Sequence, residues 1–453
     1  MKRFLLDKAE HLTDKLQGAI HGAYVEIPRF RVSETDDFAF AEPDYPDEGW
    51  PELTVDQQWG VSNVVRWFRA KVTIPEEMRG QPLDLILRPG PRLDNDTAAE
   101  ALLYLNGTEA HGLDQWHSEV RLSAAQSHAE TLSVAMRAWS GMACRYRIFD
   151  EARLAVVDEA AERLYYLLRA SVQTLRELEA DSTAHIALLQ LTDETLRMID
   201  FVRQGEPAYE RSLNDAYAHM RQGLSAASFP ETCRVALCGH SHIDMAWLWQ
   251  LEHTCDKASR TFSTVLALMD RYPDYVYSQS SPYLYEQVAR KYPRLFERVR
   301  QHIKEGRWEI TGGMWVEPDT NLPSGESLVR QILLGKGYMR SQFGVDCTVL
   351  WLPDVFGYSW TLPQLLKKSG IRYMWTNKMS WNQYNRFPYD TFKWRGMDGS
   401  EVLVQLGSCP EKNVPWGATY NGIIAPWEVK GTWRQYAQKD INSEVLMPFG
   451  WGD

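Results

Sequence analysis

The chain has 453 residues, which exceeds what one hydrophobic core normally supports, so two or three domains are expected. Its net charge of −11 and the lack of a Lys/Arg-rich tract exclude a protein that binds nucleic acid through a basic surface. No apolar run suits a signal peptide or a membrane span, so no membrane partner is expected. The six cysteines are scattered and include no Cys-x-x-Cys pair, which predicts a cytoplasmic protein without disulfides.

Residues 1–150 are predicted to form a β-sandwich after an opening helix. Apolar residues recur at helical spacing over residues 1–20. Strands are expected at Val64–Ile74, Leu83–Leu87 and Ala101–Leu105, and the last of these leads into Asn-Gly, a strong hairpin signal. Short strands separated by proline and glycine are typical of a sandwich. We expect this domain to support its neighbour rather than to bind sugar.

Residues 151–228 are predicted to form a helical connector. The sequence period changes at about Glu151, and leucines then recur at helical spacing from Leu164 to Leu178. Two further helices are expected at Ala184–Phe201 and Tyr209–Leu224. The apolar stripes of these helices are interpreted as packing surfaces.

Residues 229–453 alternate between strand and helix patterns, which predicts a barrel-like α/β domain with a parallel sheet. The expected strands are Arg234–Cys238, Tyr275–Ser278, Trp308–Gly312, Thr348–Leu352, Tyr373–Thr376, Val402–Leu406 and Val445–Pro448. The expected helices are Tyr283–Glu305, Ser327–Phe343 and Leu362–Ser369. Because active sites of such domains lie at the carboxyl ends of the strands, polar residues that follow a strand are candidates.

The most informative of these segments follows the first strand of the domain and reads GHSHIDMAWLW. His240, His242 and Asp244 alternate at the end of a strand, so their side chains can converge on one point. Nitrogen and oxygen donors on one side and an open position on the other suit a divalent metal. Its tryptophans offer flat apolar faces to a sugar ring. The alternative interpretation is that one histidine belongs to the core and that Asp244 caps a helix.

Further polar residues follow later strands. GGMWVEPD follows the third strand, Asp354 follows the fourth in WLPDVFGYS, and Asn377 and Lys378 follow the fifth. Asp453 ends the chain in FGWGD, after the last strand.

Four segments together resemble class II α-mannosidases, glycoside hydrolase family 38, and most of all its cytosolic and bacterial branch. They are HSHIDMAWLW, GGMWVEPDTNLPSGES, WLPDVFGYS and TNKMSWNQYNRFPYDTFKWRGMDGS. The resemblance is strong over residues 232–453. It is weaker in the N-terminal region, where Leu105–Gly107 and Gly112–His117 resemble the accessory domain of that branch.

The resemblance implies metal and catalytic roles for four residues. His242, Asp244 and Asp354 would bind one divalent ion, Zn²⁺ by default, with Co²⁺ or Mn²⁺ able to replace it. Asp354 would also be the nucleophile, and Asp453 is the candidate for the general acid and base. The implied activity is retaining hydrolysis of terminal α-D-mannosyl residues through a covalent glycosyl-aspartate intermediate.

The resemblance also implies substrate contacts. Trp247 and Phe356 would line the subsite of the sugar, and Lys378 would hold the nucleophile. Mannose-containing oligosaccharides are therefore the expected partners, and a homo-oligomer is possible because larger assemblies occur in the family.

One feature departs from the family pattern. The family's fourth metal ligand is a histidine well downstream of the glycine-rich turn, whereas this chain has no histidine after His302 and stops at Asp453. We therefore expect a truncated catalytic domain, in which His240 is an alternative ligand. Two rival classes stay open: a metal hydrolase of the amidohydrolase type, which also uses a His-x-His pair, and a non-catalytic carbohydrate-binding fragment.

Overall fold

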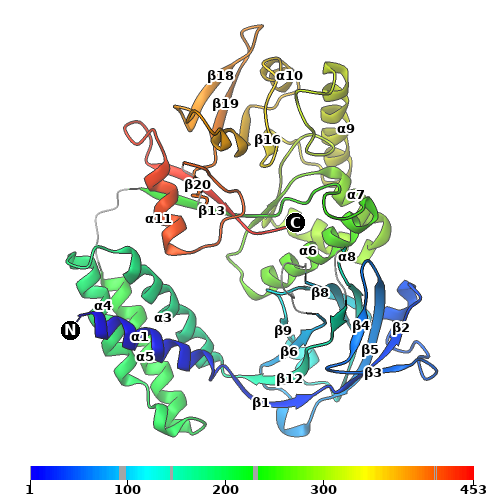
Figure 1. The fold of residues 1–453 in the computed structure, drawn as a ribbon, viewed down its shortest axis with the longest axis vertical. Helices are drawn as coiled ribbons and strands as arrows, with labels where there is room; N and C mark the ends of the chain where they lie inside the picture. The colour runs from blue at the N-terminus through cyan, green and yellow to red at the C-terminus, as the bar shows by residue number, and fades with distance from the viewer. Residues whose placement is uncertain are drawn as a thin grey trace. The chain divides into compact units, whose positions relative to one another are not determined.

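A computed structural model describes residues 2–90, 98–142, 146–227, 233–412, 414 and 416–452. The chain divides into two compact units, Met1–Glu231 with Ala425–Trp427 and the remainder of the chain, and each unit is described by itself. Figure 1 shows strands and helices in both of them. Among the described residues, every helix is too short or too polar to cross a membrane.

The first unit contains the predicted β-sandwich. Its strands are β1 (His21–Glu26), β2 (Arg29–Ser33), β3 (Glu52–Thr54), β4 (Gln58–Gly60), β5 (Val65–Thr73), β6 (Leu83–Arg88), β7 (Glu100–Leu105), β8 (Thr108–Leu113), β9 (Glu119–Arg121), β10 (Thr131–Trp139), β11 (Arg147–Ile148) and β12 (Glu151–Val157). One sheet has the order β1-β12-β6-β9, the other β3-β2-β5-β10-β7-β8, and β11 pairs with β4. Their apolar faces enclose a core in which the ring of Phe149 lies 4.8 Å from that of Phe30 and 5.5 Å from that of Phe68.

The three strands predicted in this region are present as β5, β6 and β7, and the predicted hairpin joins β7 to β8. Asn106 and Gly107 connect these strands with φ angles of 51° and 80°, the left-handed pair that a type I′ turn requires. The central strands β5 and β10 pair antiparallel over nine residues each. Long pairing of this kind fixes the register of the larger sheet.

Helices α1 (Lys2–Gln17), α3 (Glu159–Glu177), α4 (Thr183–Met198) and α5 (Pro207–Ala226) pack into a bundle, and α2 (Ala124–Ser127) is a single turn within the sandwich. The change from strand to helix comes later than the predicted residue 151, because β12 still pairs with β6 and β1. Asp158 then caps α3 by accepting hydrogen bonds from the backbone N–H groups of Ala160 and Ala161. The opening helix belongs to this bundle, since it packs against α3 and α4.

In the second unit, the described strands form two four-stranded sheets, so the barrel-like arrangement that we predicted is not confirmed. The strands are β13 (Arg234–His240), β14 (Tyr277–Gln279), β15 (Trp308–Ile310), β16 (Val349–Leu352), β17 (Tyr373–Thr376), β18 (Thr391–Arg395), β19 (Glu401–Leu406) and β20 (Glu444–Phe449). The order β15-β14-β13-β20 is parallel throughout, and the order β16-β17-β19-β18 ends in an antiparallel edge strand.

The two sheets of this unit separate where β15 ends. Gly312 and Gly313 adopt φ angles of 99° and 74°, which take the backbone out of the extended conformation after Ile310. A hydrogen bond from the Gly312 N–H to the Val349 carbonyl, 3.2 Å long, links the end of β15 to β16.

The helices of this unit are α6 (Leu251–Arg271), α7 (Pro282–Lys291), α8 (Pro293–Lys304), α9 (Gly325–Phe343), α10 (Leu362–Lys368) and α11 (Pro426–Gln435). The helix predicted over Tyr283–Glu305 is wrong as a single element, because Pro293 breaks it into α7 and α8. Proline lacks the N–H that a continuous helix would need, but it is well accepted as the first residue of the second helix. Helix α6 was not predicted.

Candidate active site

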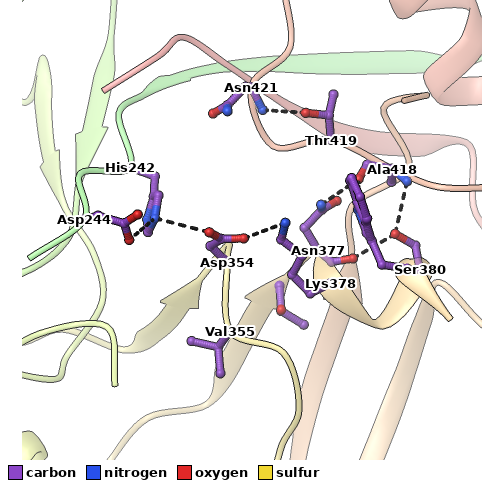
Figure 2. Close-up of polar contacts among 12 residues, drawn as sticks. His242, Asp244, Asp354, Val355, Asn377, Lys378, Ser380, Ala418, Thr419 and Asn421 are labelled. Atoms are coloured by element: carbon purple, nitrogen blue, oxygen red, sulfur yellow. Dashed lines mark hydrogen bonds and ion pairs between the residues drawn. The ribbon is translucent and has the colours of Figure 1, made fainter. Parts of the chain in front are cut away.

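The side chains of His242, Asp244 and Asp354 form a cluster beyond the carboxyl ends of two strands (Figure 2). His242 and Asp244 follow β13, and Asp354 follows β16. One possible ligand atom from each residue lies within 4.8 Å of the others. The alternation at the end of β13 and the position after β16 thus bring together the three residues that the sequence predicted to meet.

The cluster offers one imidazole nitrogen and two carboxylates to a cation. His242 Nε2 lies 3.2 Å from Asp244 Oδ1 and 3.6 Å from Asp354 Oδ2. Two carboxylates beside one imidazole carry an excess of negative charge that a divalent ion would neutralise, and this donor set suits Zn²⁺. The residues present therefore fit the implied metal.

The second oxygen of Asp354 is bound by a different group. Lys378 Nζ lies 2.7 Å from Asp354 Oδ1, and both side chains are mostly buried. The same ammonium group lies over the ring of Trp381 at 4.4 Å from its centroid, and 5.6 Å from those of Phe356 and Tyr420. Asp354 is therefore fixed on both sides, with one oxygen facing the His242 imidazole and the other facing a lysine held among aromatic rings (Figure 2).

The two aromatic residues predicted to contact a sugar are largely exposed. Trp247 is 63% exposed and Phe356 is 79% exposed. Large apolar side chains with this exposure can stack on a sugar ring without first being uncovered. No described contact joins Trp247 directly to the cluster, so its predicted role stays a prediction.

His240 is directed away from the cluster. Its ring is buried, and its Nε2 donates a hydrogen bond of 2.7 Å to the carbonyl oxygen of Tyr420. Burial lowers the pKa of His240 to about 4, so the ring is neutral near neutral pH. Alternation along a strand would place both histidines on the same face, but in the described chain only His242 belongs to the cluster.

Asp453, the predicted acid and base, lies outside the described residues. The residues that precede it, 450–452, lie against the segment that carries His242. A side chain at Gly450 or Gly452 would collide with the carbonyl oxygen of His240 or His242, respectively. The hydroxyl group of Ser241 donates a hydrogen bond of 3.3 Å to the Trp451 carbonyl. Glycine is therefore required for the close approach of residues 450–452 to the segment that carries His242.

Sequence reasoning did not single out Glu317, which also contacts the cluster. Its Oε2 lies 2.7 Å from Nδ1 of His242, on the side of the ring opposite the two aspartates. The GGMWVEPD segment indicated a polar loop after the third strand. It did not indicate which residue of that loop contacts His242. The other downstream histidines, His253 and His302, lie in helices α6 and α8 and are not among the clustered ligands found in the described chain.

A second group of possible ligands, His21, Asp84 and Glu119, lies in the smaller sheet of the sandwich. Here the positive charge comes from the protein, because Arg121 Nε lies 2.6 Å from Asp84 Oδ1 and a second nitrogen of Arg121 lies 3.2 Å from Glu162 Oε2. His21 Nε2 lies 3.0 Å from the other oxygen of Asp84. We therefore interpret this group as an ion-pair network that joins the sandwich to α3.

This network predicts a pH-dependent stability. The hydrogen bond with Asp84 raises the pKa of His21, so the folded protein favours the protonated ring. The resulting stabilisation is complete below the pKa of an unfolded histidine, about 6.5, and is lost as the pH rises through the higher folded pKa. We expect the loss of unfolding free energy caused by His21→Asn to be larger at about pH 5.5 than at about pH 9, as measured by urea denaturation. An equal loss at both pH values would contradict this assignment.

Comparison with known proteins identifies relatives for both units. Residues 232–453 match the model of the glycosyl hydrolases family 38 N-terminal domain, and residues 31–173 match that of the alpha-mannosidase jelly roll domain. Alpha-mannosidase G of Dictyostelium discoideum is 29% identical over 423 residues, which cover 89% of this chain and 37% of that protein. Alpha-mannosidase 2C1 of Homo sapiens is 30% identical over 405 residues, which cover 85% of this chain and 37% of that protein. The alpha-mannosidase of Saccharomyces cerevisiae is 28% identical over 423 residues, which cover 89% of this chain and 38% of that protein.

The chain therefore spans 37–38% of the length of these relatives. The two matched ranges include most of the β-sandwich and all the strands that position His242, Asp244, Asp354 and Lys378.

Proposed function

Because the chain belongs to glycosyl hydrolase family 38, we propose that it carries the catalytic centre of a retaining α-mannosidase. The proposed reaction is hydrolysis of terminal α-D-mannosyl residues of oligosaccharides. The observation that carries this proposal is the position of Asp354, with one oxygen facing the His242 imidazole and the other bound to Lys378.

We propose a double displacement in which Asp354, Asp453 and Lys378 have different roles. Asp354 would attack the anomeric carbon and form a glycosyl ester as the bond to the leaving oxygen breaks. Asp453 would protonate that oxygen, and would then take a proton from the water that hydrolyses the ester. Lys378, whose Nζ lies 2.7 Å from Asp354 Oδ1, would hold the attacking carboxylate in a fixed orientation.

His242, Asp244 and Asp354 would hold the divalent ion, for which we propose Zn²⁺. When bound, the ion would orient the cis 2- and 3-hydroxyl groups of mannose and favour the distorted ring of the transition state. Trp247 and Phe356 would supply apolar faces to the same sugar. Mannose is proposed as the substrate because the relatives that match this chain are named alpha-mannosidases.

The test is hydrolysis of a chromogenic α-mannoside by this chain and by a longer protein of the relatives' length, with EDTA and after Zn²⁺ or Co²⁺ is restored. We expect release of the chromophore to be lost with EDTA and recovered with metal. Full activity in a chain shown to be metal-free would overturn the proposal. Mannoside binding that survives chelation, without hydrolysis by either protein, would instead support a carbohydrate-binding protein.

A further inference from the structure

We propose that Glu317, anchored by Ser280, is a positioning residue that fixes the tautomer and the orientation of His242. In this role it would set the affinity of the cluster for a divalent cation. The inference rests on the proposed metal-dependent function and adds a residue to it. It concerns a side chain that contacts none of the reacting atoms and acts through the imidazole.

The hydrogen bonds of Glu317 determine which nitrogen of His242 faces the cluster. A carboxylate only accepts hydrogen bonds, so the His242 Nδ1 that lies 2.7 Å from Glu317 Oε2 carries a hydrogen. Nε2 lies 3.2 Å from Asp244 and 3.6 Å from Asp354, so a neutral ring, which has one hydrogen, could donate to either side. The shorter contact, with Glu317, favours the hydrogen on Nδ1 and leaves the lone pair on Nε2. The contact therefore selects the tautomer that can bind a metal between these three residues.

Glu317 is itself held in place. Its second oxygen, Oε1, accepts a hydrogen bond of 2.6 Å from the hydroxyl group of Ser280, and only 10% of its side chain is exposed. Ser280 is buried directly after β14, and the next residue, Ser281, has a φ angle of 61°. A left-handed conformation at a residue other than glycine costs free energy and often occurs at functional sites.

The segment before Glu317 is fixed by α9. The backbone N–H groups of Trp315 and Val316 donate to the backbone and side-chain oxygens of Gln331, at 2.9 Å and 3.0 Å. Gly335 lies so close to the backbone of residues 313–315 that a side chain there would collide with it. Glu317 is therefore pre-positioned by three elements, β14, β15 and α9, before any metal arrives.

A preorganised carboxylate of this kind strengthens the imidazole as a ligand, because it keeps the ring in one orientation and makes Nε2 more basic. Loss of such a partner typically weakens metal affinity about 10- to 100-fold. A residue that merely fills space beside His242 would affect stability but would leave the intrinsic metal affinity and the tautomer unchanged. Affinity and tautomer are thus the two readouts that separate the roles.

The experiment measures Zn²⁺ and Co²⁺ affinity of the full chain by competition with a chelator, for the wild type, Glu317→Ala, Glu317→Gln and Ser280→Ala. We expect about 10- to 100-fold weaker binding for Glu317→Ala. Glutamine still offers an oxygen acceptor but no charge, so Glu317→Gln should lie between alanine and the wild type. Nitrogen NMR of the metal-free chain, recorded at a pH high enough for the ring to be neutral, should show the Nδ1–H form of His242, and a mixture of forms in Glu317→Ala.

The matched control is Glu309→Gln. Glu309 Oε2 accepts a hydrogen bond of 2.8 Å from Ser278, which makes a Ser–Glu pair between β14 and β15. The described contacts of His242 with carboxylates are to Asp244, Glu317 and Asp354, and Glu309 is not among them. Its loss should leave metal affinity unchanged.

Unchanged affinity and tautomer in Glu317→Ala, with metal bound by the wild type, would overturn this inference alone. Failure of the wild type and of the longer protein to bind either metal would instead overturn the proposed function. If Glu317→Ala is unfolded by circular dichroism, Glu317→Gln and Ser280→Ala decide by the same criteria.

Discussion

Replacing Asp354 by asparagine is expected to lower kcat for α-mannoside hydrolysis on the order of 10⁴- to 10⁶-fold, the range seen when a member of a covalent catalytic group is removed. Asparagine has nearly the same shape as aspartate, but its amide does not form the glycosyl ester. The substitution also removes the charge that pairs with Lys378 Nζ at 2.7 Å. The fold should survive, because Asp354 lies beyond the end of β16 and is outside the apolar core of that sheet.

The measurement is steady-state hydrolysis by active protein, with circular dichroism of each variant to confirm folding. A fluorinated mannosyl fluoride that traps the intermediate should label Asp354 in the wild type and leave Asp354→Asn unlabelled. Asp319→Asn is the matched control, since Asp319 accepts hydrogen bonds from the backbone N–H groups of Asn321 and Leu322, as asparagine also can, and is exposed. Normal turnover by Asp354→Asn would remove the nucleophile assignment.

The proximity of His242, Asp244 and Asp354 was implied by the family resemblance, and general rules account for only part of it. Each residue follows a strand, and residues at the carboxyl ends of strands are candidates for a site. Lys378 likewise lies just after a strand, β17. Alternation alone would have included His240, and β13 and β16 belong to different sheets, so neither rule by itself selects these three residues. His242 and Asp244 lie in the irregular segment that follows β13, so their positions also depend on the path of that segment.

The contact between Glu317 and His242 was not predictable in this way. Glu317 lies in an irregular segment whose direction is set by the positive φ angles of Gly312 and Gly313, and by hydrogen bonds to Gln331. Neither can be derived from periodicity. Glycine permits a left-handed conformation but does not say which turn will form, so the side chain that reaches the imidazole became evident only in the folded chain.

The elements that were wrong or missed have local causes. Pro293 ends one helix and begins the next, whereas the apolar spacing alone continued through it. Helix α6 was missed although its apolar residues recur at helical spacing, from Cys255 through Phe262 to Met269. Its buried side also carries charged residues such as Asp256 and Arg260, which apolar spacing does not predict.

The two histidines of the His-x-His segment are expected to give opposite results when replaced. His242→Ala removes a ligand whose Nε2 faces both aspartates, so metal affinity should fall by more than the roughly 10- to 100-fold expected for an outer partner. His240→Ala should leave the affinity nearly unchanged and should lower the free energy of unfolding by about 1–3 kcal/mol, because the buried Tyr420 carbonyl loses its donor.

Chelator competition measures the first effect, and urea denaturation of the metal-free chain measures the second. His240→Gln is the informative companion, since its side-chain amide can still donate to the Tyr420 carbonyl and should recover part of the stability. His302→Gln, on helix α8, serves as a histidine control outside the cluster. Metal affinity that falls equally in His240→Ala and His242→Ala would show that both rings bind the ion. The neutral, backbone-bonded His240 would then have to turn toward the cluster when metal arrives, and its present hydrogen bond would break.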